Sequence, residues 1–192
     1  MTRHAKQWIA LLALGTLSVA CATSTPTGSP DPLTDTLTRL QERQAAGRVG
    51  AIRGYHFFSG PDVATRFTNG LVSLIPLSPD LEAAVTQAHE AYATDRRAPL
   101  APQIIQQRWA LLDDYVREVK RRGLGAMIRV TTTDPKEAHY DLTDVPEGRW
   151  LLVAEVTSRV SVLYWAVPVE VRAGQALAQN LYESNIWVEG LK

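Results

Sequence analysis

Cysteine is nearly absent from this chain, whose 192 residues contain only one, Cys21. A lone cysteine cannot form an intrachain disulfide. Excess charge is absent as well, because 20 Lys and Arg residues balance 20 Asp and Glu residues. This balance provides no electrostatic attraction for nucleic acid, and we expect no such partner. With 45% hydrophobic and 21% charged residues, the composition is that of a globular protein.

Apolar runs of transmembrane length are also missing. The run Trp8–Ala20 has 13 residues, whereas a helix that spans a bilayer needs about 20. It follows a positively charged start that contains Arg3, His4 and Lys6. A charged start and a short apolar stretch are typical of an export signal that is later removed.

The histidines outside this segment, His56, His89 and His139, are far apart in the sequence. His89 and Glu90 begin like the helix of a zinc protease, but Ala93 occupies the place of the second histidine ligand. We expect His89 to be a boundary residue of its helix. Only a close cluster of the three histidines in the folded chain would point to a metal enzyme.

Other catalytic patterns are lacking too. Asp113 and Asp114 are neighbours on a predicted helix, where adjacent side chains point about 100° apart and cannot share a proton or a metal. The sequence has no nucleophile elbow, no phosphate-binding glycine loop and no calcium loop. We therefore expect no enzyme, no cofactor and no metal, and a cryptic hydrolase is the least favoured alternative.

What is present begins with Leu17-Ser18-Val19-Ala20-Cys21, which resembles the lipobox of bacterial lipoproteins. The resemblance implies that residues 1–20 are removed and that the Cys21 thiol accepts a lipid, which anchors the protein to a membrane. Exported proteins usually pair their cysteines or have none, so a lone cysteine at this junction fits the interpretation. Ser18 stands where the pattern usually has leucine, which leaves ordinary secretory cleavage as an alternative.

The residues after Cys21 indicate where the protein lies and how it is attached. Ala22 follows the cysteine, and the resemblance to Gram-negative lipoproteins then implies the outer membrane, facing the periplasm. Residues 21–32 are rich in Thr, Ser, Gly and Pro and should form a flexible, hydrated tether. A short helix over Leu33–Ala46, stopped by Gly47, is predicted to begin a single domain over residues 33–192.

Strands are predicted on both sides of a helical segment at about residues 79–122. Val49–Phe58 and Leu71–Pro76 have strand character. A turn at Ser59–Asp62 follows the first of these strands, and Asn69-Gly70 is a hairpin signal before the second. The last third contains five candidate strands: Leu124–Thr133, Ala138–Leu142, Arg149–Thr157, Ser161–Arg172 and Gln175–Tyr182.

Two helices are predicted in the inserted segment. Ser78 caps the first, with Pro79 in its first turn, and a break over Asp95–Pro102 precedes the second. The second ends at Lys120–Gly123, where cations and a glycine suit a helix C-terminus. The same basic triplet has a phosphate- or lipid-binding alternative. Apolar residues follow helical spacing in both helices: Leu81, Ala84, Val85, Ala88 and Tyr92, then Ile105, Trp109, Leu112, Val116 and Val119.

Alternation along Ser161–Arg172 indicates a strand with one face toward a core. The core set contains Leu163, Trp165, Val167, Val169 and Val171. Pro168 cannot donate to a neighbouring strand, so we expect a sheet edge or a bulge there. The other face carries Val162, Tyr164 and Ala166, which the helical pair or a partner protein should cover. We predict a mainly β protein with a helical insertion (α+β), an antiparallel sandwich carrying a two-helix hairpin.

Two segments resemble the carboxypeptidase regulatory-like domains, which are transthyretin-like, Ig-like β-sandwiches. These segments are Thr131-Thr132-Thr133-Asp134 with Tyr140-Asp141-Leu142, and Val145-Pro146-Glu147-Gly148-Arg149-Trp150 with the four residues that follow. Gly70–Pro76 also resembles a strand of this family. Lys136-Glu137-Ala138 departs from it, because the family usually has glycine in this turn. The resemblance implies an accessory, non-catalytic module.

The function expected from these features is that of a structural or protein-interaction module of the cell envelope. An envelope protein is the expected partner, besides the membrane that holds the lipid. The alternative is a carbohydrate- or peptidoglycan-binding module that uses exposed aromatic rings of the β region. The candidate binding residues are Trp150, Tyr164 and Trp187.

Overall fold

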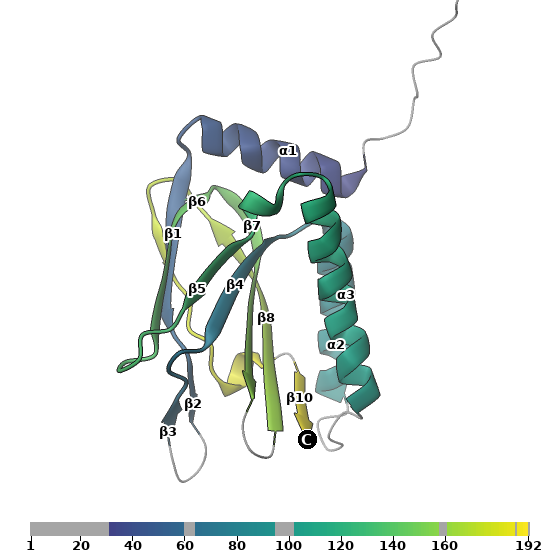
Figure 1. Cartoon of the computed structure of the whole chain (residues 1–192), viewed down its shortest axis with the longest axis vertical. Coiled ribbons are helices and arrows are strands. Elements are labelled where there is room, and N and C mark those ends of the chain that lie inside the picture. Colours follow the sequence, from purple (N-terminus) through teal and green to yellow (C-terminus); the bar gives the residue numbers. More distant parts are fainter. Residues whose placement is uncertain (1–30, 60–63, 95–101, 158–160, 187, 192) are drawn as a thin grey trace, which may run out of the picture.

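The computed structural model describes residues 31–59, 64–94, 102–157, 161–186 and 188–191 (Figure 1). Two sheets face each other, and two long helices cover the outer face of the larger sheet. This arrangement confirms the predicted β-sandwich with a helical insertion. Among the described residues, no helix combines the length and the apolar character needed to cross a membrane.

The smaller sheet has the strand order β6-β1-β9, and the larger has the order β10-β8-β7-β4-β5. The strands of the smaller sheet are β1 (Val49–Tyr55), β6 (His139–Pro146) and β9 (Ala176–Ala178). Those of the larger sheet are β4 (Leu71–Pro76), β5 (Arg129–Thr132), β7 (Gly148–Thr157), β8 (Ser161–Val171) and β10 (Val188–Leu191). A short ribbon of β2 (Phe57–Ser59) and β3 (Ala64–Arg66) extends from one end.

The space between the sheets is filled by large apolar side chains. Trp150 and Trp165 are both fully buried in it. The predicted core set of β8 is confirmed, because Leu163, Val169 and Val171 are buried in the same cluster and Val167 packs against it. Tyr140 and Leu142 contribute from the facing strand β6. The burial of these large apolar side chains is the main source of stability for such a fold.

A second apolar layer lies between the larger sheet and the helices α2 (Pro79–Thr94) and α3 (Pro102–Arg121). Tyr164 and Ala166 of β8 are buried there against residues of both helices, which include Leu81, Val85 and Leu112. The helical pair therefore covers this face of β8. The side chain of Val162 and the break at residues 95–101 lie outside the described residues, as do the side chains of Tyr92 and Ile105.

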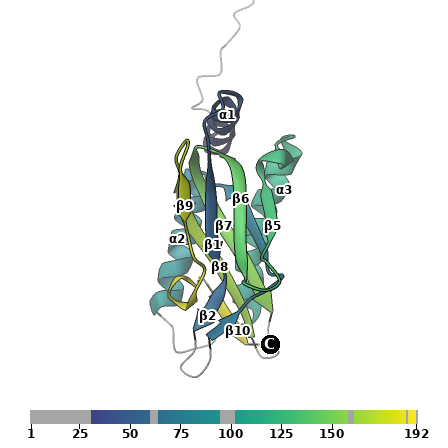
Figure 2. The ribbon, with the colours of Figure 1, turned by 90° about the vertical axis from the view of Figure 1, so that its left-hand side faces the viewer.

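The first helix, α1 (Pro32–Ala45), lies across one end of the sandwich (Figure 2). It begins and ends one residue earlier than predicted. Leu33 and Leu37 pack with Val119 of α3, and Leu40 reaches the core between the sheets. The helix thus closes that end of the core.

The predicted helix ends are confirmed. The Ser78 hydroxyl accepts a hydrogen bond from the Leu81 amide at 3.3 Å, and Pro79 begins α2. α3 ends at Arg121, two residues before Gly123, whose φ is 75°. Pro168 lies at a sheet edge as expected, because β10 pairs only with residues 161–164 of β8.

Several predicted details of strand pairing are wrong. Asn69 adopts a φ of 58°, but it does not join paired strands, because β3 and β4 belong to different sheets. Instead, the Gly70 amide donates to the Thr133 hydroxyl at 2.7 Å, which ties β4 to the end of β5. The sandwich is also not fully antiparallel, since β1 and β9 run parallel. The segment Leu124–Thr133 contains a 3-10 turn over Gly125–Met127 before β5.

The predicted turn at Ser59–Asp62 is only partly visible, because residues 60–63 lie outside the described part. The flanking strands do pair, with Phe57 opposite Arg66. At Val145–Gly148 the chain passes from β6 in one sheet to β7 in the other. Gly148 has a φ of 149°, and Trp150 enters the core two residues later.

Candidate aromatic binding surface

The aromatic residues proposed from the sequence do not form an exposed surface. Trp150 is fully buried between the sheets, where its indole nitrogen donates to the Pro146 carbonyl at 2.9 Å. Tyr164 is buried under the helices, with its ring centroid 4.6 Å from that of Trp109. This prediction is wrong for both residues, because both faces of the larger sheet are covered. Trp187 lies outside the described residues, as does Cys21 with the rest of residues 1–30.

The three histidines do not come together. His89 is exposed on α2, His139 begins β6 in the smaller sheet, and His56 is buried between β1 and β2. Within the described ranges, no three His, Cys, Asp or Glu side chains come together in a way that suits a metal ion. Asp113 and Asp114 are exposed on α3, which agrees with a solvated helix face.

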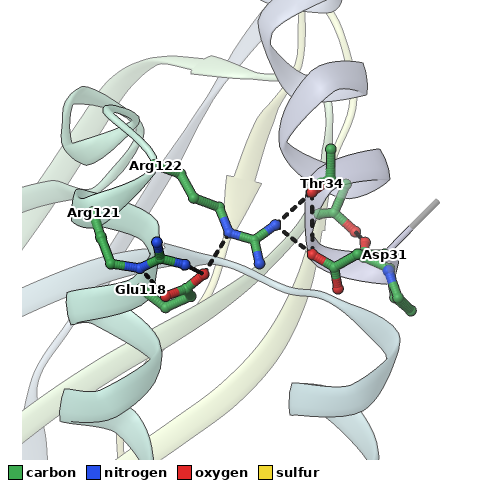
Figure 3. A network of polar contacts seen from close by, with 7 residues as sticks. Asp31, Thr34, Glu118, Arg121 and Arg122 are labelled. Carbon is green, nitrogen blue, oxygen red and sulfur yellow. Dashed lines mark hydrogen bonds and ion pairs between the residues drawn. The ribbon is translucent and has the colours of Figure 1, made fainter.

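Two residues of the basic triplet at the end of α3, Arg121 and Arg122, bind carboxylates (Figure 3). The guanidinium groups of Arg121 and Arg122 both donate to Glu118, at 2.6–2.7 Å. Their hydrogen bonds lower the pKa of Glu118 from 4.5 to about 2. Arg122 also donates to Asp31, just before α1, and to Thr34. These contacts join α3 to α1, and they favour the structural interpretation over a phosphate-binding one.

Exposed aromatic rings lie instead at the end of the smaller sheet opposite α1, where β1 leads into β2 (Figures 1 and 2). We call Tyr55, Phe57, His139 and Tyr182 the aromatic surface. Tyr55 is 46% exposed, and its ring meets the edge of His139 with centroids 5.3 Å apart. Tyr182 is 37% exposed and stacks on Phe57 with centroids 5.9 Å apart and planes at 21°.

A hollow of about 340 Å³ opens beside these rings. It is lined by Tyr55 and Phe57 and by two charged side chains, Arg66 of β3 and Glu137. Both charged residues are exposed, and neither side chain has a hydrogen bond or an ion pair with any part of the chain that the structure describes. The hollow therefore offers one unpaired donor group, one unpaired acceptor group and two aromatic rings.

Backbone and asparagine hydrogen bonds hold the aromatic surface in place. The Tyr55 amide donates to the Asn180 side chain at 3.1 Å, and its carbonyl accepts from the Leu181 amide at 2.9 Å. The Phe57 amide donates to the Leu181 carbonyl at 3.0 Å. The Tyr182 amide donates to the Asn185 side chain at 2.9 Å. Two distant segments of the chain, 55–57 and 180–185, are thus fixed side by side.

A tight turn over Asp134–Ala138 positions Glu137. The Asp134 carboxylate accepts hydrogen bonds from the amides of Lys136 and Glu137, at 2.7 and 2.9 Å, and these lower its pKa. Ala138 has a φ of 59°, a left-handed conformation that suits glycine. Its carbonyl accepts from the His56 amide at 2.9 Å. This is the turn in which the resembled family usually has glycine, and in this chain Ala138 adopts the left-handed conformation.

One local pattern in the sequence indicates this surface. In Tyr55-His56-Phe57, strand alternation places the first and third side chains on one side and the second on the other. The structure follows this pattern, because His56 is fully buried while Tyr55 is exposed and Phe57 is half-buried. Which side faced the solvent depended on the neighbouring segment 180–185, and the sequence did not show that contact.

Comparisons with known proteins give no family for this chain. The sequence matches no protein-family model and no curated protein. Among solved structures, it is similar to a Pseudomonas aeruginosa protein described as a candidate carbohydrate-binding protein. The TM-score is 0.40 and the sequence identity is 18%, and the match covers 74% of this chain and 96% of the other. It is also similar to the minor pilin GBS52 of Streptococcus agalactiae, with a TM-score of 0.38 and 7% identity over 71% of this chain. This chain spans 44% of the pilin chain.

Proposed function

We propose that this protein is a lipid-anchored, non-catalytic interaction module of the cell envelope and that it acts through the aromatic surface. The observation that carries this proposal is the group of exposed rings at one end of the sandwich. Exposed aromatic side chains held on a rigid scaffold are typical binding anchors, because they bury a large area with little loss of conformational freedom.

The position of the surface suits an anchored protein. α1 lies at the opposite end of the sandwich (Figure 1), and Cys21 comes before this helix in the sequence. A lipid on Cys21 would place α1 toward the membrane and the aromatic surface away from it. We propose the outer membrane, facing the periplasm, because Ala22 rather than aspartate follows the cysteine.

A non-catalytic role is supported by two features. The sequence resembles the carboxypeptidase regulatory-like domains, which are accessory modules. In addition, the described residues that line the hollow are two aromatic rings and two oppositely charged side chains, and this set contains no serine, threonine, cysteine or histidine. This set is suited to holding a ligand rather than to transforming it.

The anchor is tested by metabolic labelling with a fatty acid in the source bacterium. The wild-type protein should take up the label and remain with the membranes, while Cys21→Ser should lose the label and become extractable with buffer. An unlabelled wild-type protein, or a Cys21→Ser variant that stays with the membranes, would contradict lipid anchoring.

The binding surface is tested with purified Cys21→Ser protein mixed with washed envelopes of the same bacterium. We expect retention to fall roughly fivefold or more for Tyr55→Ala and for Tyr182→Ala, as for interface anchors in general. Leu71→Ala and Val130→Ala are matched controls, since these apolar residues are 53% and 57% exposed on the larger sheet. Equal retention of all four variants would refute the role of the aromatic surface.

A further inference from the structure

We propose that the hollow at the aromatic surface binds an uncharged glycan chain. This inference rests on the proposed function and names the ligand of the same surface. The juxtaposition behind it is that of the Tyr55 and Phe57 rings with Arg66 and Glu137 around one hollow of about 340 Å³.

The charges around the hollow favour a neutral ligand. Arg66 and Glu137 contribute one positive and one negative group, and neither is neutralised by another described side chain. A polyanion attracted to the Arg66 guanidinium would be repelled by the Glu137 carboxylate, and a polycation attracted to Glu137 would be repelled by Arg66, so a charged ligand gains little net attraction. A neutral ligand avoids both penalties.

The hydrogen-bonding groups favour hydroxyls. A guanidinium can only donate hydrogen bonds and a carboxylate can only accept them. A hydroxyl group does both, so neighbouring hydroxyls on one sugar ring can satisfy Arg66 and Glu137 together. Hydrogen bonds to charged groups are stronger than those between neutral groups, and both side chains are exposed and ready to form them.

The aromatic rings favour contact with the C–H groups on the faces of a sugar ring. A pyranose ring has hydroxyl groups around its rim and C–H groups on its faces. The C–H groups carry slight positive charge and are attracted to the negative face of an aromatic ring. Tyr55, with almost half of its surface exposed, and the stacked pair of Phe57 and Tyr182 provide such rings next to the two charged groups.

The shape and the rigidity of the surface suit a chain rather than a small molecule. The hollow is open to the solvent at the end of the sandwich, so a ligand can extend beyond it on either side. Hydrogen bonds of Asn180 and of the backbone connect residues 55–57 with 180–185, and the Asn185 side chain fixes Tyr182, so the rings are held before a ligand arrives. Such pre-organisation reduces the entropy lost on binding.

The test uses purified full-length Cys21→Ser protein and two-dimensional NMR titrations. The uncharged probes are tetramers of β-1,4-glucose, α-1,4-glucose, β-1,3-glucose and β-1,4-N-acetylglucosamine. The charged probes are tetragalacturonic acid and the glucosamine tetramer. At least one uncharged tetramer should shift the amide signals of residues 55–57, 137–139 and 180–182, and the charged tetramers should bind at least tenfold more weakly.

Variants connect this binding to the hollow. Tyr55→Ala, Arg66→Gln and Glu137→Gln should each weaken binding of the uncharged tetramer about fivefold or more. Val130→Ala, on the other sheet, should bind as well as the parent protein does. The proposal is overturned if no uncharged tetramer binds with a Kd below about 10 mM, or if the three variants bind it unchanged.

Competition separates this inference from the proposed function. If the aromatic variants lose retention on envelopes but the uncharged tetramers do not compete for it, the surface binds a different partner, such as an envelope protein. The glycan inference then fails while the interaction module stands. If retention does not depend on the aromatic surface, the proposed function fails as well.

Discussion

His56 lies edge-on against Trp165, with ring centroids 4.5 Å apart and planes at 87°. Phe67 covers it from another direction, with centroids 5.0 Å apart. Within the described structure, neither imidazole nitrogen has a hydrogen-bond partner. Burial without a partner opposes the charged form and lowers the pKa of His56 from 6.5 to about 4. The folded protein therefore holds a neutral imidazole directly behind the aromatic surface.

This pKa predicts that the protein loses stability in mild acid. Between pH 6.5 and pH 4, the unfolded chain binds a proton at His56 and the folded chain does not. The free energy of unfolding should therefore fall by up to about 1.4 kcal/mol for each pH unit in this window, and the contribution is constant above it. Urea denaturation at pH 7.5, 6.5, 5.5 and 5.0 measures the slope.

His56→Leu is the control for this prediction, because leucine fills the space without a titratable group. Its free energy of unfolding should change little between pH 6.5 and pH 5.0. Three carboxyl groups have lowered pKa values: Asp31, Glu118 and Asp134. They change protonation at lower pH and do not determine the slope of stability between pH 6.5 and pH 5.0. A slope in His56→Leu as steep as in the parent protein would contradict the assignment to His56.

The sequence predicted the elements whose signals are local. The Ser78-Pro79 start of α2 depends on a hydroxyl and a fixed φ within four residues, and the structure confirms it. The alternation along β8 was equally readable, because each side of this strand meets a different apolar layer. The same alternation predicted that the helical pair or a partner protein covers the outer face, and the structure shows that the helices cover it.

The strand pairing and the binding surface depended on contacts between distant segments. Asn69-Gly70 has hairpin residues, yet its hydrogen bonds go to Thr133, 63 residues farther along the chain. Trp150 was expected at a surface, but β7 is covered on both faces and buries it. Conversely, Tyr55 is the last residue of the apolar strand β1, yet its side chain is exposed. The reason is that β1 ends at the end of the smaller sheet.

Gly54 approaches the backbone of the segment that carries Tyr182. A Cβ atom on Gly54 would lie 1.7 Å from the Gln179 carbonyl oxygen and 2.8 Å from the Tyr140 hydroxyl. Gly54→Ala must therefore push β1 and residues 178–182 apart, and we expect it to lower the free energy of unfolding by about 2 kcal/mol. Chemical denaturation measures this loss.

Gly47→Ala is the comparison for Gly54→Ala. Apart from the adjacent residues, no atom of the described structure lies within 4 Å of the added methyl group. The cost is limited to the φ of 68° at this position, about 1 kcal/mol. If Gly54→Ala costs no more than Gly47→Ala, the contact between β1 and the 178–182 segment is looser than described. If Gly54→Ala remains folded, it should also weaken envelope retention, because it displaces Tyr182 from Phe57.

Arg122 links the carboxylate of Glu118 in α3 to that of Asp31, just before α1, and NMR measures the pKa of each carboxyl group. In Arg122→Gln, the pKa of Glu118 should rise from about 2 toward 4.5, since one of its two guanidinium partners is lost. The lowered pKa of Asp31 should also return toward 3.8, because its hydrogen bond to Arg122 is the main cause of the shift. Carboxyl carbon shifts followed from pH 1.5 to 7 report both values.

Arg121→Gln separates the effect on the pKa of Glu118 from the effect on the pKa of Asp31. Arg121 contacts Glu118 but not Asp31, so this variant should raise the pKa of Glu118 and leave that of Asp31 unchanged. A pKa of Asp31 that stays low in Arg122→Gln would mean that the link between α3 and the start of α1 does not form in solution.

Tyr115 joins α3 to the point where β4 passes into α2. Its hydroxyl donates to the Pro76 carbonyl at 2.8 Å and accepts from the Ser78 amide at 3.3 Å. Tyr115→Phe keeps the ring but leaves both backbone groups without this partner, so the free energy of unfolding should fall by about 1–2 kcal/mol. Tyr182→Phe is the matched control, because its hydroxyl group is on an exposed side chain and its removal should cost less than about 0.5 kcal/mol. Equal stability of the two variants would show that water replaces the Tyr115 hydroxyl and that packing alone holds α3 on the sheet.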